Sequence, residues 1–235
     1  MSESMSDQVS NEGLILTIGP LHIFDTIIIS WGIILLLWLL VWLFTRHLEI
    51  KPSAVQTAIE GVVTTFENAV SSIAPQHARQ LLPFIGSLWI FLVIANLSGL
   101  IPGIHSPTSD LSATSALACL VFLSVHWFGI RSQGVKNYLR HYLKPSPILL
   151  PFHIIGEITR TIALAIRLFG NMMSLEMAAL LMLMVAGLLV PVPIMMLHII
   201  EALVQAYLFG LLALIYIAGG LQAHQIKQQK EEKNL

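Results

Sequence analysis

The feature that most constrains this chain is a set of long apolar runs without charge. Three of them, 27–44, 81–104 and 111–130, contain no Asp, Glu, Lys or Arg. Each is close to the roughly 20 residues with which an α-helix crosses the hydrocarbon core of a bilayer. Charged residues make up 11% of the 235 residues, against about a quarter in soluble domains. The sequence therefore predicts an integral membrane protein.

The placement of the basic residues predicts the orientation. The N-terminal segment, the 103–110 loop and the Pro191–Pro193 turn carry no Lys or Arg. Basic segments face the cytoplasm under the positive-inside rule, so we expect the N-terminus outside, the C-terminus in the cytoplasm and an odd number of crossings. Five crossings fit. The basic residues that set this orientation are Arg46, Lys51, Arg79, Arg131, Lys136, Arg140, Lys144, Lys227, Lys230 and Lys233.

These patterns predict an all-α integral membrane fold with about five membrane-crossing helices. Apolar residues at helical spacing over 53–73 predict an amphipathic helix along the cytoplasmic interface, with packing on a partner helix as the alternative. We expect a single membrane domain. It divides into an outside segment (1–24), three spans with the interfacial helix (25–144), an ion-path hairpin (145–224) and a cytoplasmic tail (225–235).

The C-terminal hairpin is unusually long. No convincing helix breaker lies between Pro147 and Pro191, which predicts a helix of roughly 60 Å, about twice the ~30 Å hydrocarbon core. Such a helix must tilt strongly, curve or extend outside the core. The chain then returns as a second apolar helix through Tyr216 to about Leu221. A tilted hairpin of this kind suits a surface that lies against another subunit.

Polar residues recur along both helices of this hairpin. On the first helix one side, an arc of about 100°, holds His153, Glu157, Arg160, Arg167, Asn171 and Ser174, and Glu176 points roughly opposite. On the return helix an arc of about 60° holds His198, Glu201 and Gln205. A charge at the centre of a membrane helix costs ~2.5–3.5 kcal/mol or more. Such residues are therefore the usual markers of an ion path.

Some of these residues also have structural interpretations. Glu157 and Arg160, three residues apart, fit a structural ion pair as well as an exit path. Asn171 favours a hydrogen bond between helices over a direct ion role. His198 could be a satisfied core histidine, but Glu201 and Gln205 on its face favour a hydrated path. The remaining histidines, His105 and His126 among them, lie near span ends or in loops, where interfacial solvation accounts for them, and no metal-ligand spacing appears.

Arg167 stands apart from these residues. It lies about twenty residues into the apolar helix, with no acidic residue one turn away. A guanidinium is permanently charged, so an unpaired one at this depth implies a counter-charge from another chain.

Several segments resemble one family. RLFGNMMSLEMA (167–178) and HIIEALVQAYLFGLL (198–212) resemble the two C-terminal motifs of subunit a of F-type ATP synthases, the F0-sector family also known as ATPase subunit 6. FDTIIISW (24–31) resembles the entry into its first helix, and ANLSGLIPG and PTSDLSAT (95–114) its second-span end and following loop. The GEITRTIALAIRLFGNMM run is similar to the divergent N-type branch. Thr161 stands where many members have Pro, and His153 where Glu is frequent.

The resemblance implies a stator subunit that is not an enzyme on its own. It implies Arg167 facing a rotating ring of c subunits, each with a mid-membrane carboxylate, and two offset half-channels for H⁺ or Na⁺. Entry would use Glu176, His198, Glu201 and Gln205, and exit His153 and Glu157. The implied partners are the c-ring, b-type peripheral-stalk subunits, the remaining F0F1 subunits and lipid. The implied location is the plasma (inner) membrane of a bacterium or archaeon, and no cofactor is expected.

Two other classes were weighed on the residues alone. A stand-alone transporter or proton channel often shows internal repeats, and the sequence shows none. A structural scaffold predicts apolar interfaces instead of ionisable residues on both hairpin helices. The net charge of −1 gives no basic surface for nucleic acid, and the chain has no Walker-type phosphate loop.

Overall fold

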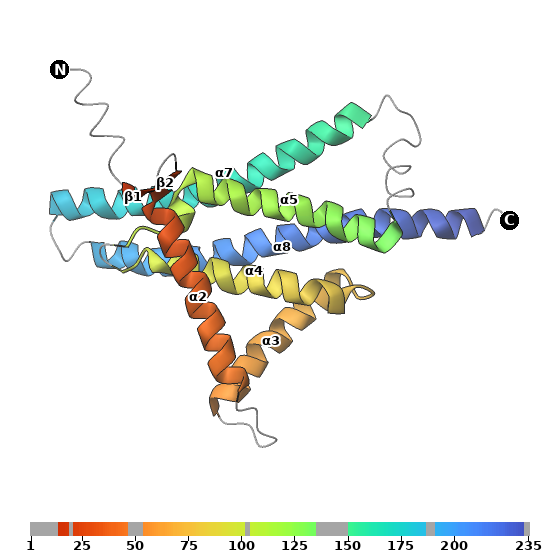
Figure 1. Cartoon of the computed structure of the whole chain (residues 1–235), viewed down its shortest axis with the longest axis horizontal. Coiled ribbons are helices and arrows are strands. Elements are labelled where there is room, and N and C mark those ends of the chain that lie inside the picture. Colours follow the sequence, from red (N-terminus) through yellow and green to blue (C-terminus); the bar gives the residue numbers. More distant parts are fainter. Residues whose placement is uncertain are drawn as a thin grey trace.

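The computed structural model describes residues 14–18, 21–46, 54–101, 104–134, 150–186 and 191–232. Four helices form the bundle: α4 (Ala78–Ser98), α5 (Leu111–Gln133), α7 (Leu150–Ala186) and α8 (Pro191–Glu232). Helix α2 (Asp25–Thr45) and helix α3 (Ala54–Ile73) form a V on one side of the bundle, with the point of the V directed away from it (Figure 1). Five of the described helices, α2, α4, α5, α7 and α8, are long and apolar enough to span a membrane. The predicted all-α membrane fold is confirmed.

One element was not predicted. Strands β1 (Leu14–Ile18) and β2 (Leu21–Phe24) form an antiparallel hairpin just before α2. The sequence predicts an outside segment over residues 1–24, with no strand assigned to it. Strand β1 includes the β-branched residues Ile15, Thr17 and Ile18, a residue type that strands favour. A short hairpin is invisible to a search for membrane-length helices.

Helix α2 makes little contact with the bundle. Its outward side chains are apolar, with Trp31 74%, Leu35 67% and Trp38 64% exposed. A helix that is apolar all round and not covered by protein matches a membrane span. The predicted helix at 53–73 is present as α3, and its last turns pack on the bundle through Phe66 and the buried Val70. Whether its first turns lie on a membrane stays a prediction.

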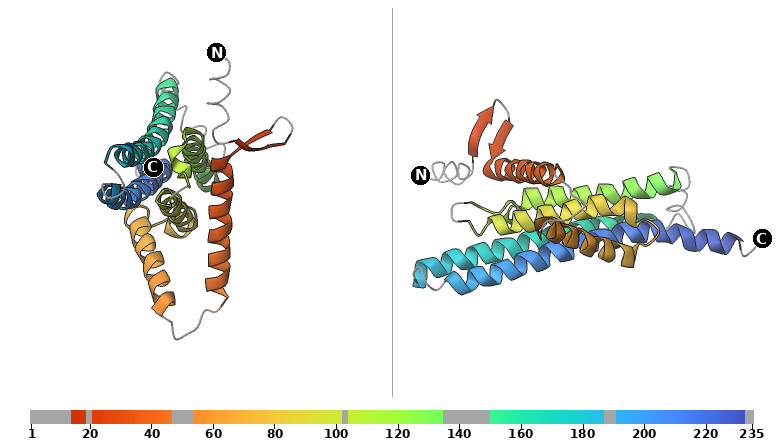
Figure 2. Two further views of the ribbon diagram at one scale, coloured as in Figure 1. Left: turned by 90° about the vertical axis from the view of Figure 1, so that its left-hand side faces the viewer. Right: turned by 90° about the horizontal axis from the view of Figure 1, so that it is seen from below.

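Helices α7 and α8 are the longest, at 37 and 42 residues, or about 56 Å and 63 Å. They run side by side beneath α4 and α5 in the right-hand view of Figure 2. Pro191 and Pro193 stand in the first turn of α8, where the missing N–H costs no helical bond. We expected α8 to end near Leu221, but only its apolar span does. The helix continues to Glu232 because the polar residues beyond are good helix formers without Gly or Pro.

The core lies where α4, α5, α7 and α8 meet. Trp89 of α4 stacks on Tyr207 of α8, with ring centroids 6.0 Å apart, and its Nε1 donates to the Tyr207 carbonyl at 3.2 Å. Its indole lies directly over Gly210, where any Cβ would overlap it. The largest buried side chains around this contact are Leu81, Ile85, Leu92, Leu168, Met172, Phe209, Leu214 and Ile217.

The short helix η1 (Pro107–Ser109) leads into α5, and the next residue, Asp110, fixes the start of that helix. The Asp110 side chain caps that helix by accepting from the Ser112 backbone N–H at 2.9 Å, as N-cap carboxylates do. At the other end Gly134 adopts φ 77 and its N–H bonds to the Ile130 carbonyl. We use these residues to name the two ends of the bundle, the η1 end and the Gly134 end.

Candidate functional site

The polar residues of α7 and α8 meet at mid-length. Asn171 Nδ2 donates to Gln205 Oε1 at 2.8 Å. Gln205 is 2% exposed, and its Nε2 has no hydrogen-bond partner among the described residues. A buried donor without a partner costs about 1–3 kcal/mol. The sequence indicated an interhelical role for Asn171, and the structure supplies the partner.

Arg167 lies one turn before Asn171 on the same face of α7. It is exposed, although its neighbour Leu168 is fully buried. No hydrogen bond or ion pair joins its guanidinium to any other described residue. The cation therefore points out of this chain at the middle of its longest apolar span.

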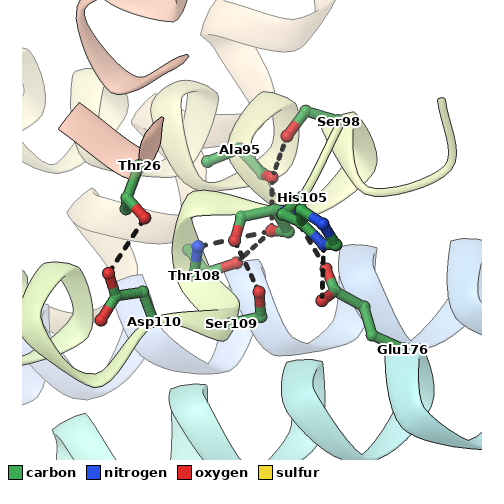
Figure 3. Close-up of polar contacts among 9 residues, drawn as sticks. Thr26, Ala95, Ser98, His105, Thr108, Ser109, Asp110 and Glu176 are labelled. Carbon is green, nitrogen blue, oxygen red and sulfur yellow. Dashed lines mark hydrogen bonds and ion pairs between the residues drawn. The ribbon is translucent and has the colours of Figure 1, made fainter. Parts of the chain in front are cut away.

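At the η1 end, Glu176 faces the loop between α4 and α5 (Figure 3). Its Oε1 accepts from the Ser106 backbone N–H at 3.0 Å, and its Oε2 lies 4.0 Å from His105 Nδ1. The Glu176 side chain is 18% exposed and that of His105 76%. Gly99 allows this approach, because a Cβ there would lie 3.1 Å from Glu176 Oε1.

A cavity of about 570 Å³ opens beside Glu176. Helix α8 contributes His198, which is 4% exposed and whose Nε2 has no hydrogen-bond partner among the described residues. Glu176 and His198 were predicted to share one path, and they line one cavity. Its other walls are Gly99, Leu100, Ile101, Ile104, His105, Ala179, Leu180, Leu183, Val192, Ile194 and Met195.

A buried hydrogen-bond network, which the sequence analysis missed, holds this end together. Asn96, fully buried, donates to the Ala202 carbonyl of α8 at 3.0 Å and accepts from Thr108 Oγ1 at 2.7 Å. Ser106 Oγ contacts Thr108 Oγ1 at 2.7 Å and donates to the Ala95 carbonyl. Farther out, Thr26 of α2 donates to Asp110 at 2.9 Å (Figure 3). In the sequence, the feature that could have indicated this network is Asn96, an isolated amide inside the apolar run 81–104.

The Gly134 end holds a second group. Glu157 Oε2 lies 3.9 Å from His126 Nε2 of α5, and the Arg160 guanidinium lies 4.7 Å from the centre of the Tyr216 ring. A cavity of about 20 Å³ is lined in part by Glu157, Arg160 and Tyr216. His126 was interpreted as an interfacial histidine, but it is half-buried and faces a carboxylate. The fold brings them together because α5 packs along α7.

The structure leaves two predicted path residues untested. Glu201 lies between His198 and Gln205 along α8 and is partly exposed. No hydrogen bond or ion pair joins it to another residue of the described ranges. His153 lies on α7 one turn before Glu157, and its side chain falls outside the described part. Within that part, no group of three His, Cys, Asp or Glu could hold a metal ion.

Five of the described helices are of membrane length, and the hairpin of α7 and α8 carries a buried amide, a buried imidazole and partly buried carboxylates. These features define a multi-pass membrane protein with polar groups along two helices. The chain belongs to the ATP synthase A chain family, whose model matches residues 27–218. It is 60% identical over 216 residues to ATP synthase subunit a 2 of Pelobacter propionicus, covering 92% of this chain and 95% of that one. It is 54% identical to ATP synthase subunit a of Legionella pneumophila, covering 92% and 94%.

More distant relatives agree. ATP synthase subunit a 2 of a Bradyrhizobium strain is 44% identical over 208 residues, which are 88% of this chain and 93% of that one. The resemblance seen in the motifs at 167–178 and 198–212 is therefore confirmed over nearly the whole chain. Membership of this family decides against the two alternatives, a stand-alone transporter and a structural scaffold. This is a membrane subunit of the F0 sector of a bacterial ATP synthase, and its placement in the N-type branch stays a prediction.

Proposed function

We propose that this chain forms two ion half-channels against a ring of c subunits and couples ion passage to rotation. The observation that carries the proposal is the Arg167 guanidinium, exposed at mid-span without a partner in the described part of the chain. A charge at this depth costs ~2.5–3.5 kcal/mol or more unless it faces water or an opposite charge. A carboxylate on a ring subunit supplies that charge.

In this proposal Arg167 is the stator charge. A nearby cation favours the ionised form of a carboxylate, so each ring carboxylate that reaches Arg167 gives up its ion. Arg167 lies ten residues after Glu157 and nine before Glu176, about 15 Å and 14 Å along the helix. The cation therefore separates the two ends, and no ion crosses straight between them.

The entry half-channel starts at the η1 end. The cavity of about 570 Å³ with Glu176 and His198 has the volume and the polar groups to hold water. Glu201, Gln205 and Asn171 continue from it toward the middle of the hairpin. The exit at the Gly134 end uses Glu157 and His153. We place the η1 end outside and the C-terminus in the cytoplasm, following the basic residues.

The ring rotates because the ion is driven between these ends. The membrane potential supplies about 2.3 kcal/mol per charge per 100 mV. The chain itself catalyses no chemical step in this scheme. Its partners are the c-ring, b-type peripheral-stalk subunits, the other F0F1 subunits and the surrounding lipid.

The test is transport in vesicles that contain the assembled complex, with Na⁺ present or absent. Arg167→Ala should abolish both ATP-driven pumping and ion-driven ATP synthesis while the complex still assembles. Arg160→Ala is the matched control on the same helix, since its guanidinium already rests on Tyr216, and it should retain coupling. Coupled transport in both directions by Arg167→Ala would reject the proposal. A requirement for Na⁺ would name the ion.

A further inference from the structure

The pair of His126 and Glu157 joins α5 to α7 at the Gly134 end, and the function proposed above gives His126 no role. We propose that His126 exchanges the translocated proton with Glu157 on the exit path and passes it toward the cytoplasmic face. This inference rests on the proposed function. It adds a residue from α5 to a route otherwise built from the hairpin alone.

The orientation of the imidazole is fixed by the backbone. His126 Nδ1 lies 2.9 Å from the Phe122 carbonyl oxygen. A carbonyl oxygen only accepts, so Nδ1 carries the hydrogen in this contact. Nε2 is then the atom that gains or loses a proton, and Nε2 faces Glu157 Oε2 at 3.9 Å. The Phe122 ring, with its centroid 4.4 Å from that of the imidazole, supports this position.

Water can complete the relay. A separation of 3.9 Å is too long for a direct hydrogen bond, and one water bridges such a gap. Both side chains are reachable, with exposed fractions of 31% for His126 and 24% for Glu157. Glu157 also lines a cavity of about 20 Å³, which His126 does not line and which exceeds the ~10–15 Å³ that one water needs.

The step balances as a proton transfer. The Glu157 O–H bond breaks, an Nε2–H bond forms through the bridging water, and an imidazolium faces a carboxylate. The Nε2–H bond then breaks and the proton passes to water at the cytoplasmic face. Among the described residues, the other charged or titratable groups near the pair are Arg160, Tyr216 and, five residues along α5, Arg131. His153 lies one turn before Glu157 on α7.

The experiment uses membrane vesicles that hold the complete complex. The pH of the cytoplasmic face is varied, and the membrane potential is adjusted so that the total proton-motive force stays constant. A positioned proton-transfer group contributes ~10²-fold or more, and water recovers part of this. We therefore expect His126→Gln to slow proton flow toward the cytoplasm by about tenfold. In the parent protein, this flow should fall as the cytoplasmic pH drops, because an imidazole takes a proton from Glu157 only in its neutral form. His126→Gln should lose that fall.

Controls separate this role from a structural one. His77→Gln removes an imidazole at the same end of the bundle, just before α4, and should keep the parental rate and profile. Glu157→Gln should slow flow as His126→Gln does, and the double variant should be no slower than either single one. His126→Asn is a second variant, with a shorter amide donor, in case His126→Gln fails to assemble.

The possible failures are distinguishable. If His126→Gln and His126→Asn keep the parental rate and pH profile while Arg167→Ala abolishes transport, the inference is wrong and the proposed function stands. If transport requires Na⁺ and does not depend on cytoplasmic pH, the inference about His126 is likewise wrong and the proposed function stands. If Arg167→Ala still couples transport to ATP, the proposed function fails and the inference fails with it.

Discussion

Each end of the bundle has a histidine that faces a glutamate, but the surroundings of the two pairs differ. At the η1 end His105 faces Glu176 beside a cavity of about 570 Å³. At the Gly134 end His126 faces Glu157 beside one of about 20 Å³. A buried network through Asn96 and Thr108 fixes the first end, whereas a contact with its own helix backbone fixes the second histidine.

In the proposed function, this difference lets one chain serve two half-channels. Hydrogen bonds hold the wide end by joining α4 to η1 and α8, and α7 to the residue before η1. The narrow end has a cavity with room for about one water, and in the inference above it relies on side chains that exchange a proton. The carboxylates of both ends belong to the same helix, with Arg167 between them.

The largest expected effect comes from removing each carboxylate in turn. Glu176→Gln should reduce proton conduction about 100-fold, near the usual contribution of a positioned proton-transfer group. Among the described residues, it is the only carboxylate that lines the large cavity. Glu157→Gln should reduce conduction only about tenfold, because water remains at that end. Conduction through the membrane sector without its catalytic head measures both, and equal losses would remove the functional difference between the ends.

Next in size is the loss of the buried network. Asn96→Ala removes two hydrogen bonds that join α4 to η1 and α8, and such bonds in membrane proteins contribute about 0.6–1.7 kcal/mol each. We expect about 1–2 kcal/mol of lost stability in unfolding by a denaturing detergent. Ser124→Ala is the control toward the Gly134 end, because Ser124 bonds only within its own helix. A loss in Ser124→Ala as large as that in Asn96→Ala would show that the network has no special role.

The smallest effect concerns the attachment of α2. Thr26→Val removes the hydrogen bond to Asp110 at 2.9 Å, which is only partly buried, and a typical hydrogen bond contributes about 0.5–1.5 kcal/mol. The expected result is faster proteolysis between α2 and α3 with little change in transport. Ser30→Ala, which loses only a bond to its own helix, should behave like the parent protein. A transport defect in Thr26→Val would extend the functional part of the η1 end to α2.

The spans were predictable from sequence because the thickness of the bilayer sets the length of the apolar run that each membrane helix needs. The charge-free runs 27–44 and 111–130 became α2 and α5 with ends shifted by a few residues. Helical spacing also placed Arg167 and Asn171 on one face, which the structure retains. These properties depend on a single helix and its solvent.

The contacts between helices were not predictable in the same way. Ser106 reaches Glu176 only because the loop after α4 folds back over α7, and no local pattern encodes that path. His126 looked like an interfacial residue because its partner lies on another helix. The rotation of α5 against α7 decides this contact, and one sequence holds no direct record of that rotation.

The contact of Trp89 with Gly210 has a mechanical consequence. The indole fits over the backbone of α8 at Gly210 and donates a hydrogen bond to the Tyr207 carbonyl. The contact therefore fixes the rotation of α8 relative to α4. Turning α8 by one residue position, about 100°, would drive the side chain of Phe209 or Leu211 into the ring. In the proposed function, a ring of subunits that rotates past the hairpin would push α8 sideways, and the Trp89 contact would pass that force to α4. The contact would then keep α8 from turning about its own axis.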